Sequence, residues 1–304
     1  MVIRVSSNNV FYSFSPEAVP AIIVDAGSIV EVETLDCFSN QIVSENQLVT
    51  EIDFSKVNPA TGPIYVKNAK RGDALKVRVL DIKINDRGII VSIPGAGVLG
   101  DKVSRAKTKF CHIKNGYVYF NNIEIKARPM IGVIGVVPDR PAPTGTPGRH
   151  GGNLDTKLIT IGSTIYLPVY REGGLLGIGD LHAVIGDGEI CVAACEVSGR
   201  VLIEVDVVKG LAPKWPIVET DEAYYILVSR EDLWEAFREA TDLAVKALAH
   251  NNSLEWEDAY MLASMVVDIQ VSQLVNPLKT VRVRIPKDYV SLEKLLEAVK
   301  AEDL

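Results

Sequence analysis

The sequence predicts a β-rich α+β fold in which many short strands precede a smaller region that contains the helices. Apolar and polar residues alternate in short segments such as Ala74–Ile84, which is typical of strands with one buried face. Polar turns, for example Arg71-Gly72-Asp73, separate these segments. Helical spacing of apolar residues occurs only after residue 229. Short strands at close spacing favour a β sandwich or jelly roll over a parallel α/β sheet.

We expect two structural regions. The first, residues 1–228, is a β-rich sandwich that includes a loop dense in proline and glycine at residues 138–155. A long irregular segment in a compact domain is often functional, although a linker between domains has the same composition. The second, residues 229–304, is an α+β part packed on the first. Strands of the first region are expected at residues 22–35, 74–84, 88–93, 117–125, 159–170, 201–208 and 223–228.

The second region is expected to begin with a helix. Ser229 stands at its expected N-cap, and apolar residues from Leu233 to Leu248 recur at helical spacing. A second helix is expected over residues 254–266, with Ser253 as its cap. Strands at residues 267–275 and 281–285 and a closing helix at residues 291–301 complete the prediction.

Composition and charge exclude several classes of function. The chain has 304 residues, of which 47% are hydrophobic and 23% charged, as in soluble globular proteins. Its net charge of −7 argues against nucleic acid as a partner, because phosphate contacts need a basic surface. The sequence contains no basic amphipathic helix of the kind that binds a membrane surface. It also contains no apolar run long enough to span a bilayer. The first residues lack the apolar core of a signal peptide, so we expect a cytoplasmic protein.

The cysteines do not form a recognisable redox or zinc motif. They are Cys37, Cys111, Cys191 and Cys195, and no two of them stand in a CxxC pair. Cys191 and Cys195 are too far apart on an extended strand to form a disulfide with each other. We expect the four thiols to behave as small buried hydrophobic groups.

Residues 179–198, GDLHAVIGDGEICVAACEVS, combine acidic residues and a histidine with small and apolar residues. Ile190–Val197 shows no polar/apolar alternation, which predicts a strand buried on both faces. Buried carboxylates are costly unless they are hydrogen-bonded, paired or bound to a metal. The segment is therefore a candidate functional site.

The residue types in this segment suit a metal or catalytic centre. Asp180 and His182 are two residues apart, so on an extended chain their side chains point the same way. Together with Asp187 and Glu189 they supply the mixture of oxygen and nitrogen ligands that Zn, Mn or Ca sites use. Asp36 stands where an apolar strand meets a polar turn, which fits a solvated turn carboxylate as well as a site residue.

Several blocks of the chain, in the same order, resemble the acetamidase/formamidase family. The segment from Gly179 to Glu196 is similar to the hallmark segment of that family. The other similar blocks are Thr34–Phe38 with Gln41, Gly62–Val66, Arg128–Pro138, His150–Thr156, Tyr166–Val169 and Ser272–Pro277. The family segment often has glycine in place of Leu181 and Gly-Thr in place of Val192-Ala193. We expect the larger apolar side chains of this chain to narrow or reshape the pocket.

The resemblance implies hydrolysis of a short aliphatic amide, such as formamide or acetamide, to the acid and ammonia. It also implies a jelly-roll-like β sandwich with a smaller C-terminal α+β part, a divalent metal site and a homo-oligomer, for which we favour a dimer. Zinc is the expected metal, with calcium or manganese as alternatives. The only partner expected besides a second copy is the small amide substrate.

The residues of the matching blocks allow a hypothesis about their roles. Asp36, Asp180 and His182 bind the metal, and Glu196 is either a further ligand or a buried partner. Glu189 or Asp187 takes a proton from the attacking water and passes it to the leaving nitrogen. The expected substrate-binding residues are His150, Gly151, Gly152, Asn153 and Asp155.

Two alternatives remain open at this point. One is an amidase in which Cys191 or Cys195 acts as the nucleophile. The other is a β-sandwich binding module without catalytic activity, in which the carboxylates hold structural calcium.

Overall fold

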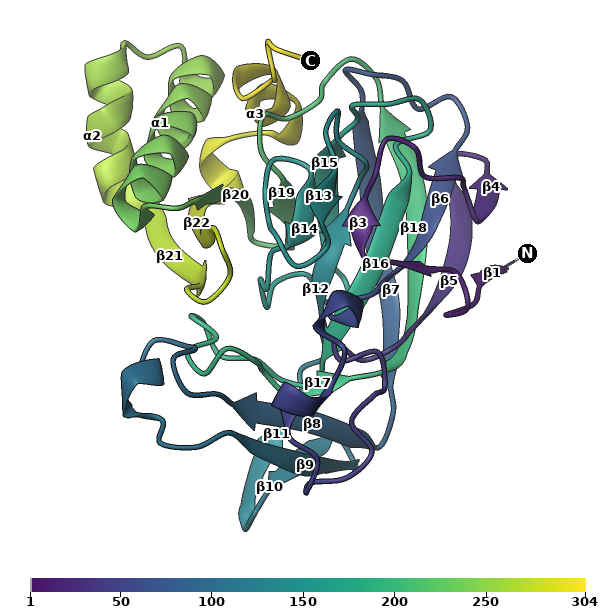
Figure 1. Cartoon of the computed structure of the whole chain (residues 1–304). Helices are drawn as coiled ribbons and strands as arrows, with labels where there is room; N and C mark the ends of the chain where they lie inside the picture. Colours follow the sequence, from purple (N-terminus) through teal and green to yellow (C-terminus); the bar gives the residue numbers. More distant parts are fainter. Residues whose placement is uncertain (1) are drawn as a thin grey trace.

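The structure, a computed structural model that describes residues 2–304, is a β-rich α+β fold with two large sheets (Figure 1). The fold class expected from the sequence is therefore confirmed. The first sheet has nine strands in the order β1 (Ile3–Val5), β5 (Ser28–Thr34), β18 (Gly199–Val208), β7 (Ala74–Ile84), β15 (Thr164–Pro168), β19 (Ile217–Glu219), β20 (Ala223–Arg230), β22 (Lys279–Pro286) and β21 (Asp268–Gln273).

The second sheet has eleven strands and carries most of the candidate site. Its main path runs β11 (Ile123–Lys126), β10 (Tyr117–Phe120), β9 (Lys107–Lys114), β8 (Arg87–Ser92), β17 (Glu196–Val197), β16 (Leu176–His182), β12 (Met130–Gly135) and β14 (Gly151–Asn153). Off this path, β6 (Ala60–Val66) pairs with β16, β2 (Val10–Phe11) and β4 (Ile22–Val24). In Figure 1, β17 joins the body that contains β16 to the lower group of strands β8–β11. A two-stranded ribbon pairs β3 (Ser13–Phe14) with β13 (Ala142–Pro143).

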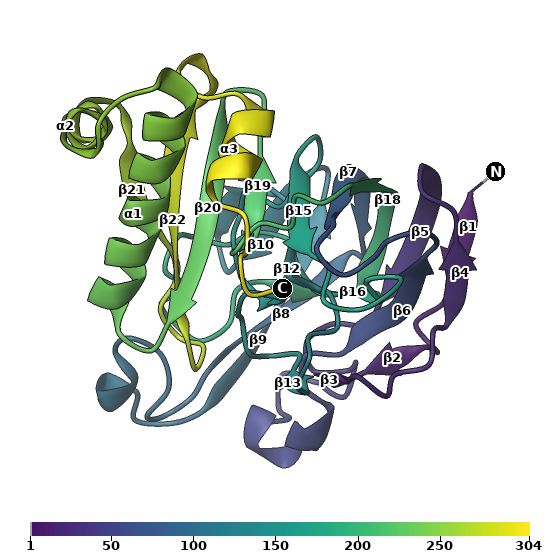
Figure 2. The same cartoon turned by 90° about the horizontal axis from the view of Figure 1, so that it is seen from above.

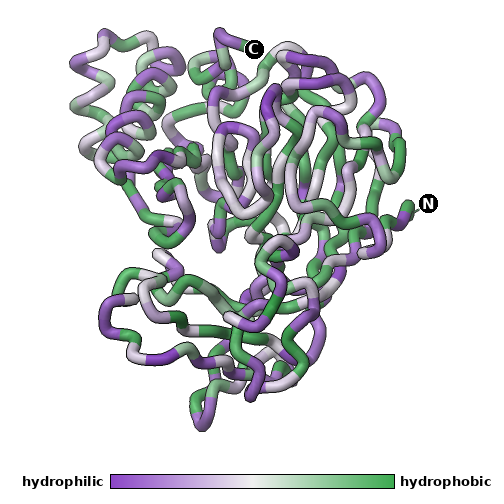
Figure 3. Tube along the Cα trace, viewed as in Figure 1, coloured by the Kyte–Doolittle hydropathy of each residue, from purple (hydrophilic) through white to green (hydrophobic). Residues whose placement is uncertain are grey.

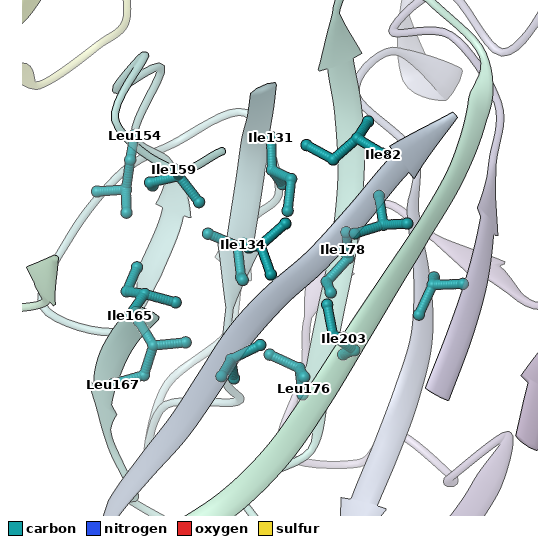
Figure 4. Close-up of a cluster of buried hydrophobic side chains, with 14 of the residues drawn as sticks. Ile82, Ile131, Ile134, Leu154, Ile159, Ile165, Leu167, Leu176, Ile178 and Ile203 are labelled. Carbon is teal, nitrogen blue, oxygen red and sulfur yellow. The ribbon is translucent and has the colours of Figure 1, made fainter. Parts of the chain in front are cut away.

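The main hydrophobic core lies between the two sheets. Ile165, Leu167 and Ile203 come from the nine-stranded sheet, and Ile131 and Ile178 come from the eleven-stranded sheet. Figure 4 shows these side chains gathered between the strands. Hydrophobic residues follow the strands of both sheets in Figure 3, which is the pattern that two packed inner faces require.

The helices cover one end of the nine-stranded sheet. They are α1 (Leu233–Asn252), α2 (Trp256–Val266) and α3 (Leu292–Ala298), and Figure 2 shows them beside β20, β22 and β21. Buried alanines and leucines of α1 pack on β20 and β22 in a second hydrophobic cluster. Strands β20 and β22 pair within the sheet that begins in the N-terminal region, so the two parts share one sheet. The helices of the described residues include none with the length and apolar character of a membrane span.

The N-caps of α1 and α2 differ from the predicted ones. Ser229 lies in β20, and α1 is capped by Asp232, whose carboxylate accepts a hydrogen bond from the backbone N–H of Glu235. Ser253 ends α1 in a left-handed conformation with φ 53°, and α2 begins after Glu255. A serine near a helix end can cap either the start or the end of a helix. Because only Leu254 separates Ser253 from Glu255, Ser253 ends α1 and Glu255 is the N-cap residue of α2. The closing helix does have Ser291 as its cap, as the sequence suggests.

The prediction of a strand over Ile190–Val197 is wrong for most of its length. Only Glu196 and Val197 form a strand, β17, and Ile190 is 60% exposed. The backbone N–H of Val192 donates to the carbonyl of Glu189 at 3.0 Å, which closes a turn. Both residues have positive φ, 47° for Glu189 and 82° for Val192, which an extended strand does not allow. The apolar run therefore forms a turn and a loop at the edge of the site.

Candidate active site

The acidic residues and the histidine of the hallmark segment meet in the interior. Asp180 and His182 lie on β16, and Glu196 on β17 is paired directly opposite His182. Asp155 joins them from the chain that follows β14, and Glu189 from the turn that precedes β17. These five side chains are between 1% and 7% exposed. The structure thus collects one imidazole and four carboxyl groups away from solvent.

The imidazole of His182 is the centre of this cluster. Its Nε2 atom lies 3.2 Å from Glu196 Oε2, 3.5 Å from Asp180 Oδ2 and 3.8 Å from Asp155 Oδ1. Both ring nitrogens of His182 lack a hydrogen-bond partner of good geometry within the described chain, as do Asp155 Oδ1, Asp180 Oδ1 and Glu196 Oε2. Buried polar atoms are normally paired, so these atoms are available as ligands for a cation or a water molecule.

The donor atoms fit a divalent cation. Candidate ligand atoms form two groups, and within each group the atoms lie within 4.8 Å of one another. One group comes from Asp155, His182 and Glu189, and the other from Cys37, Asp180 and Glu196. Imidazole and carboxylate donors are the usual ligands of catalytic zinc and of manganese. Cys37 was expected only as a buried hydrophobic group, so its place beside these carboxylates is new information from the fold.

The backbone around the cluster is shaped to bring the carboxylates together. Gly132 on β12 lies between Asp155 and Asp180, and a Cβ atom at this position would stand 2.6 Å from Asp155 Oδ1 and 2.5 Å from Asp180 Oδ2. Asp155, Asp180 and Glu189 all adopt left-handed backbone conformations, with φ of 42°, 54° and 47°. Strained non-glycine residues gather at functional sites, where the surroundings hold them in place.

Burial controls the protonation of the cluster. Burial and, to a smaller extent, the neighbouring Asp180 carboxylate outweigh the opposing charge of His182, so that the pKa of Asp155 is raised to about 6 and that of Glu196 to about 7. The pKa of Glu189 is raised well above its ordinary value, first by burial and then by the Asp155 carboxylate. Burial opposes the charged form of His182, but the charges of Glu196 and Asp180 outweigh it and raise its pKa. The carboxyl groups repel one another, and a bound cation would relieve that repulsion.

Asp36 and Asp187 lie outside both groups of candidate ligand atoms. Asp36 is buried, and its Oδ1 atom accepts hydrogen bonds from the backbone N–H groups of Phe38 and Asn40, which holds the turn after β5. Asp187 Oδ2 lies 2.7 Å from both Arg282 and Lys157. Burial opposes the charge of Asp187, but the hydrogen bonds from these two cations lower its pKa. Asp187 is thus held as an ion-pair partner of Arg282 and Lys157.

Of the residues in the Pro/Gly loop, Asn153 and Asp155 reach the cluster or its cavity. Asn153 lines the cavity, and its Oδ1 atom has no partner in the described chain. His150 is buried edge-on against Phe14, with ring centroids 5.2 Å apart, and burial lowers its pKa to about 4. Gly151 is packed so closely that a Cβ atom would stand 2.2 Å from the Ile134 carbonyl.

Asn276 is a site residue that the sequence reasoning did not assign. Its Nδ2 atom donates to Asp155 Oδ2 at 2.7 Å and to the Asn153 carbonyl at 3.0 Å. Asn276 therefore fixes the orientation of Asp155 and of the end of β14. Asn276 stands in the block Ser272–Pro277, which resembles the family, and this resemblance is the sequence feature that could have identified Asn276 as a site residue.

A cavity of about 180 Å³ opens onto the cluster. Its polar side is formed by Asn153, Asp180, Glu189, Glu196 and Asn276. Its apolar wall includes Phe38, Val49, Val57, Val91, Ile93 and Val192. A small cavity with convergent polar groups on one side and an apolar wall on the other suits a small, mostly apolar molecule with a polar head.

Neither cysteine proposed as a nucleophile is placed for that role. Cys195 is buried, and the hydrogen bond that its thiol donates to Cys111, together with burial, raises the pKa of the Cys195 thiol. The Cys191 thiol donates to the Val91 carbonyl at 3.6 Å. No histidine hydrogen-bonds either thiol within the described residues, so the base that such a nucleophile needs is not supplied.

Leu181 has a different place from the one expected. Its side chain is fully buried in the core between the two sheets, so it does not shape the cavity. Val192 and Ala193 do line the cavity.

Comparison with known proteins agrees with this picture. The sequence model of the Acetamidase/Formamidase family matches residues 4–144 and 139–291. A formamidase of Methylophilus methylotrophus is 28% identical over 255 residues, which cover 64% of this chain and 63% of that protein. The crystal structure of an acetamidase from Bacillus halodurans has a TM-score of 0.93 and 44% identity, and covers 96% of this chain and 99% of that chain.

A second solved structure is equally similar. It is a predicted acetamidase/formamidase from Thermoanaerobacter tengcongensis with a TM-score of 0.92 and 45% identity, covering 95% of this chain and 98% of that chain. The match to the curated formamidase spans somewhat less than two thirds of that protein's length. The two structural neighbours, by contrast, are matched over almost their entire chains, and the family model covers most of the present sequence. The chain belongs to the acetamidase/formamidase family.

Proposed function

We propose that this protein hydrolyses short aliphatic amides to the carboxylic acid and ammonia. The observation that carries the proposal is the buried cluster of carboxyl groups around His182, which opens onto a small cavity with an apolar wall. A formamidase and an acetamidase among the relatives support the same reaction class.

A divalent cation fits the unpaired atoms of the cluster. Asp155, Asp180, His182 and Glu196 are the residues that would hold it, with zinc expected first and manganese or calcium as alternatives. When bound, such a cation lowers the pKa of a coordinated water and polarises a carbonyl group. Asp36 supports this site indirectly, because its hydrogen bonds hold the turn that carries Cys37, whose thiol lies within 4.8 Å of candidate ligand atoms of Asp180 and Glu196.

Glu189 is the best candidate for moving the proton. Its carboxyl group lines the cavity and is almost completely buried, so it can reach both the attacking water and the leaving nitrogen. It would accept a proton from the water at a carboxylate oxygen and deliver that proton to the amide nitrogen, which leaves as ammonia. Burial and the neighbouring Asp155 carboxylate raise the pKa of Glu189, which favours delivery of the proton to the leaving nitrogen. Asp187 is less suited, because Arg282 and Lys157 hold it in its charged form.

Asn153 and Asn276 prepare the polar end of the cavity. The free Oδ1 atom of Asn153 can accept a hydrogen bond from the N–H₂ group of the substrate. Asn276 holds Asp155 and the Asn153 backbone, so the donor and acceptor positions are fixed before the substrate enters. The apolar wall would receive the acyl group, so we expect a preference for uncharged aliphatic amides.

The direct test is ammonia release from formamide, acetamide and propionamide by the purified protein, with and without added zinc, manganese or calcium. Turnover that depends on one of these cations is the expected result. A calcium-stabilised binding module predicts the opposite: a large rise in melting temperature with calcium and no ammonia from any amide. That outcome would replace the hydrolase proposal.

The assembly and location of the protein belong to the same proposal. We retain a homo-oligomer, with a dimer favoured, and a cytoplasmic location. Light scattering coupled to size-exclusion chromatography tests the first, and cell fractionation tests the second.

A further inference from the structure

Val192 joins the wall of the cavity to the proposed proton-transfer residue. Its backbone N–H donates to the Glu189 carbonyl at 3.0 Å, so the two residues close one four-residue turn. Both residues line the same cavity. The distance between Glu189 and this part of the wall is therefore fixed by a single turn of the chain.

The backbone of Val192 is strained. Its φ of 82° lies in the left-handed region, which favours glycine and which a β-branched residue very rarely adopts. Gly188, four residues earlier, shows that the same segment does use glycine where φ is positive. A glycine at position 192 would adopt this conformation without strain.

Core packing does not explain the presence of a valine at this position. Val192 is half-buried and belongs to none of the hydrophobic clusters formed by the described residues. By contrast, Phe38, Val49 and Val91 of the same wall are buried members of one such cluster. Val192 instead lines the cavity. Backbone strain at a residue that does not contribute to the hydrophobic core suggests a functional role for that residue.

We propose that Val192 limits the length of the acyl chain that the enzyme accepts. This inference rests on the proposed amide hydrolysis and names the substrate range of that site. The isopropyl group of Val192 occupies space beside Glu189 that a longer acyl chain would need. The side chain thereby restricts the substrate to short amides, while the buried wall residues supply a fixed apolar surface.

The test compares acyl-chain profiles of Val192→Gly and the parent protein. The assay measures kcat/KM for acetamide, butyramide and hexanamide by ammonia release. Each methylene that an apolar pocket accepts or rejects is worth roughly 10–200-fold in specificity. We therefore expect Val192→Gly to raise the ratio of butyramide to acetamide at least about 10-fold. Val192→Ala, which keeps a Cβ atom at the strained position, should give a smaller change in the same direction.

Two controls separate specificity from stability. Val192→Gly should melt at the parental temperature or above it, because the strain is removed. Ser253→Gly relieves another left-handed residue, at the end of α1, and should leave the acyl-chain profile unchanged. Binding of acetate, butyrate and hexanoate, measured by calorimetry, gives the chain-length preference without turnover. In Val192→Gly this preference should shift toward the longer acids, in parallel with the kcat/KM profile.

The possible failures are distinguishable. If neither parent nor variant releases ammonia from any amide, the proposed function fails. If amides are hydrolysed but the profile of Val192→Gly stays within twofold of the parent, the role of Val192 is refuted. A clear fall in the melting temperature of Val192→Gly would also refute it, because the valine would then be needed for packing.

Discussion

Replacement of Gly132 by alanine is the sharpest test of how the cluster is built. Gly132 lies between two carboxyl groups on neighbouring chain segments, and an added Cβ atom would stand 2.5 Å from Asp180 Oδ2, 2.6 Å from Asp155 Oδ1 and 2.7 Å from the Asp180 carbonyl. Ordinary contacts begin near 3.4 Å, so both carboxyl groups would have to move by roughly 1 Å. Asp155 cannot move freely, because Asn276 holds its other oxygen at 2.7 Å.

The expected consequence is loss of the site rather than loss of the fold. Overpacking of this kind costs about 1–3 kcal/mol, which a protein of this size can tolerate. Displacing catalytic groups by about 1 Å can lower the rate about 100-fold. We therefore expect Gly132→Ala to remain folded by circular dichroism, to lose most of its bound divalent metal by elemental analysis, and to release ammonia at least about 100-fold more slowly.

A matched control is available in the same segment of the site. A Cβ atom at Gly186 would have no heavy atom within 4 Å, and the φ of Gly186 is not in the left-handed region. Gly186→Ala should therefore keep both metal content and activity. If Gly132→Ala also keeps its metal and turns over amides within twofold of the parent, the assignment of the two carboxyl groups to one cation site is refuted.

Three further predictions follow from the structure. Glu189→Gln should lower kcat for acetamide at least about 100-fold without lowering the melting temperature, because it removes the proton acceptor and keeps the shape of the side chain. Dialysis against a chelator should abolish ammonia release, and added zinc should restore it. Glu239→Gln should destabilise the protein at pH 7, where Glu239 accepts hydrogen bonds from Arg230 and Trp215 and forms an ion pair with Lys214. Burial opposes the charge of Glu239, but these partners lower its pKa from 4.5 to about 2, so its contribution is present above pH 4.5 and is lost as the pH falls toward 2. With screening by solvent this contribution is about 1–2 kcal/mol, measured as the difference in urea unfolding between variant and parent at pH 7 and at pH 3.

Each of these has an outcome that would count against it. Near-normal turnover in Glu189→Gln, together with a large loss in Asp187→Asn, would transfer the proton-transfer role to Asp187. Full activity in the chelated protein would remove the cation from the proposal. A stability difference for Glu239→Gln that does not shrink on acidification would show that the effect comes from packing and not from charge.

Local pattern was enough to predict the fold class and most of the elements. The alternation in Ala74–Ile84 corresponds to β7, and the apolar spacing from Leu233 to Leu248 lies within α1. Asp180 and His182 share one strand because they stand two residues apart, and their proximity needs no tertiary information. These features follow from backbone periodicity, which acts over a few residues and is visible in any sequence.

The composition of the complete site was decided by the sheets. Asp155 reaches His182 because β12 lies between β14 and β16 and carries Gly132. Cys37 lies 143 residues before Asp180, and Asn276 lies 121 residues after Asp155, to which it donates a hydrogen bond. The apolar run after Glu189 has the pattern of a buried strand, but Glu189 and Val192 have positive φ and belong to a turn, and Val192 lines the cavity. Strand register and the space left between side chains set these positions, and both depend on contacts between distant parts of the chain. Sequence alone therefore determined which chemical groups are available, and the tertiary structure decided which of them meet.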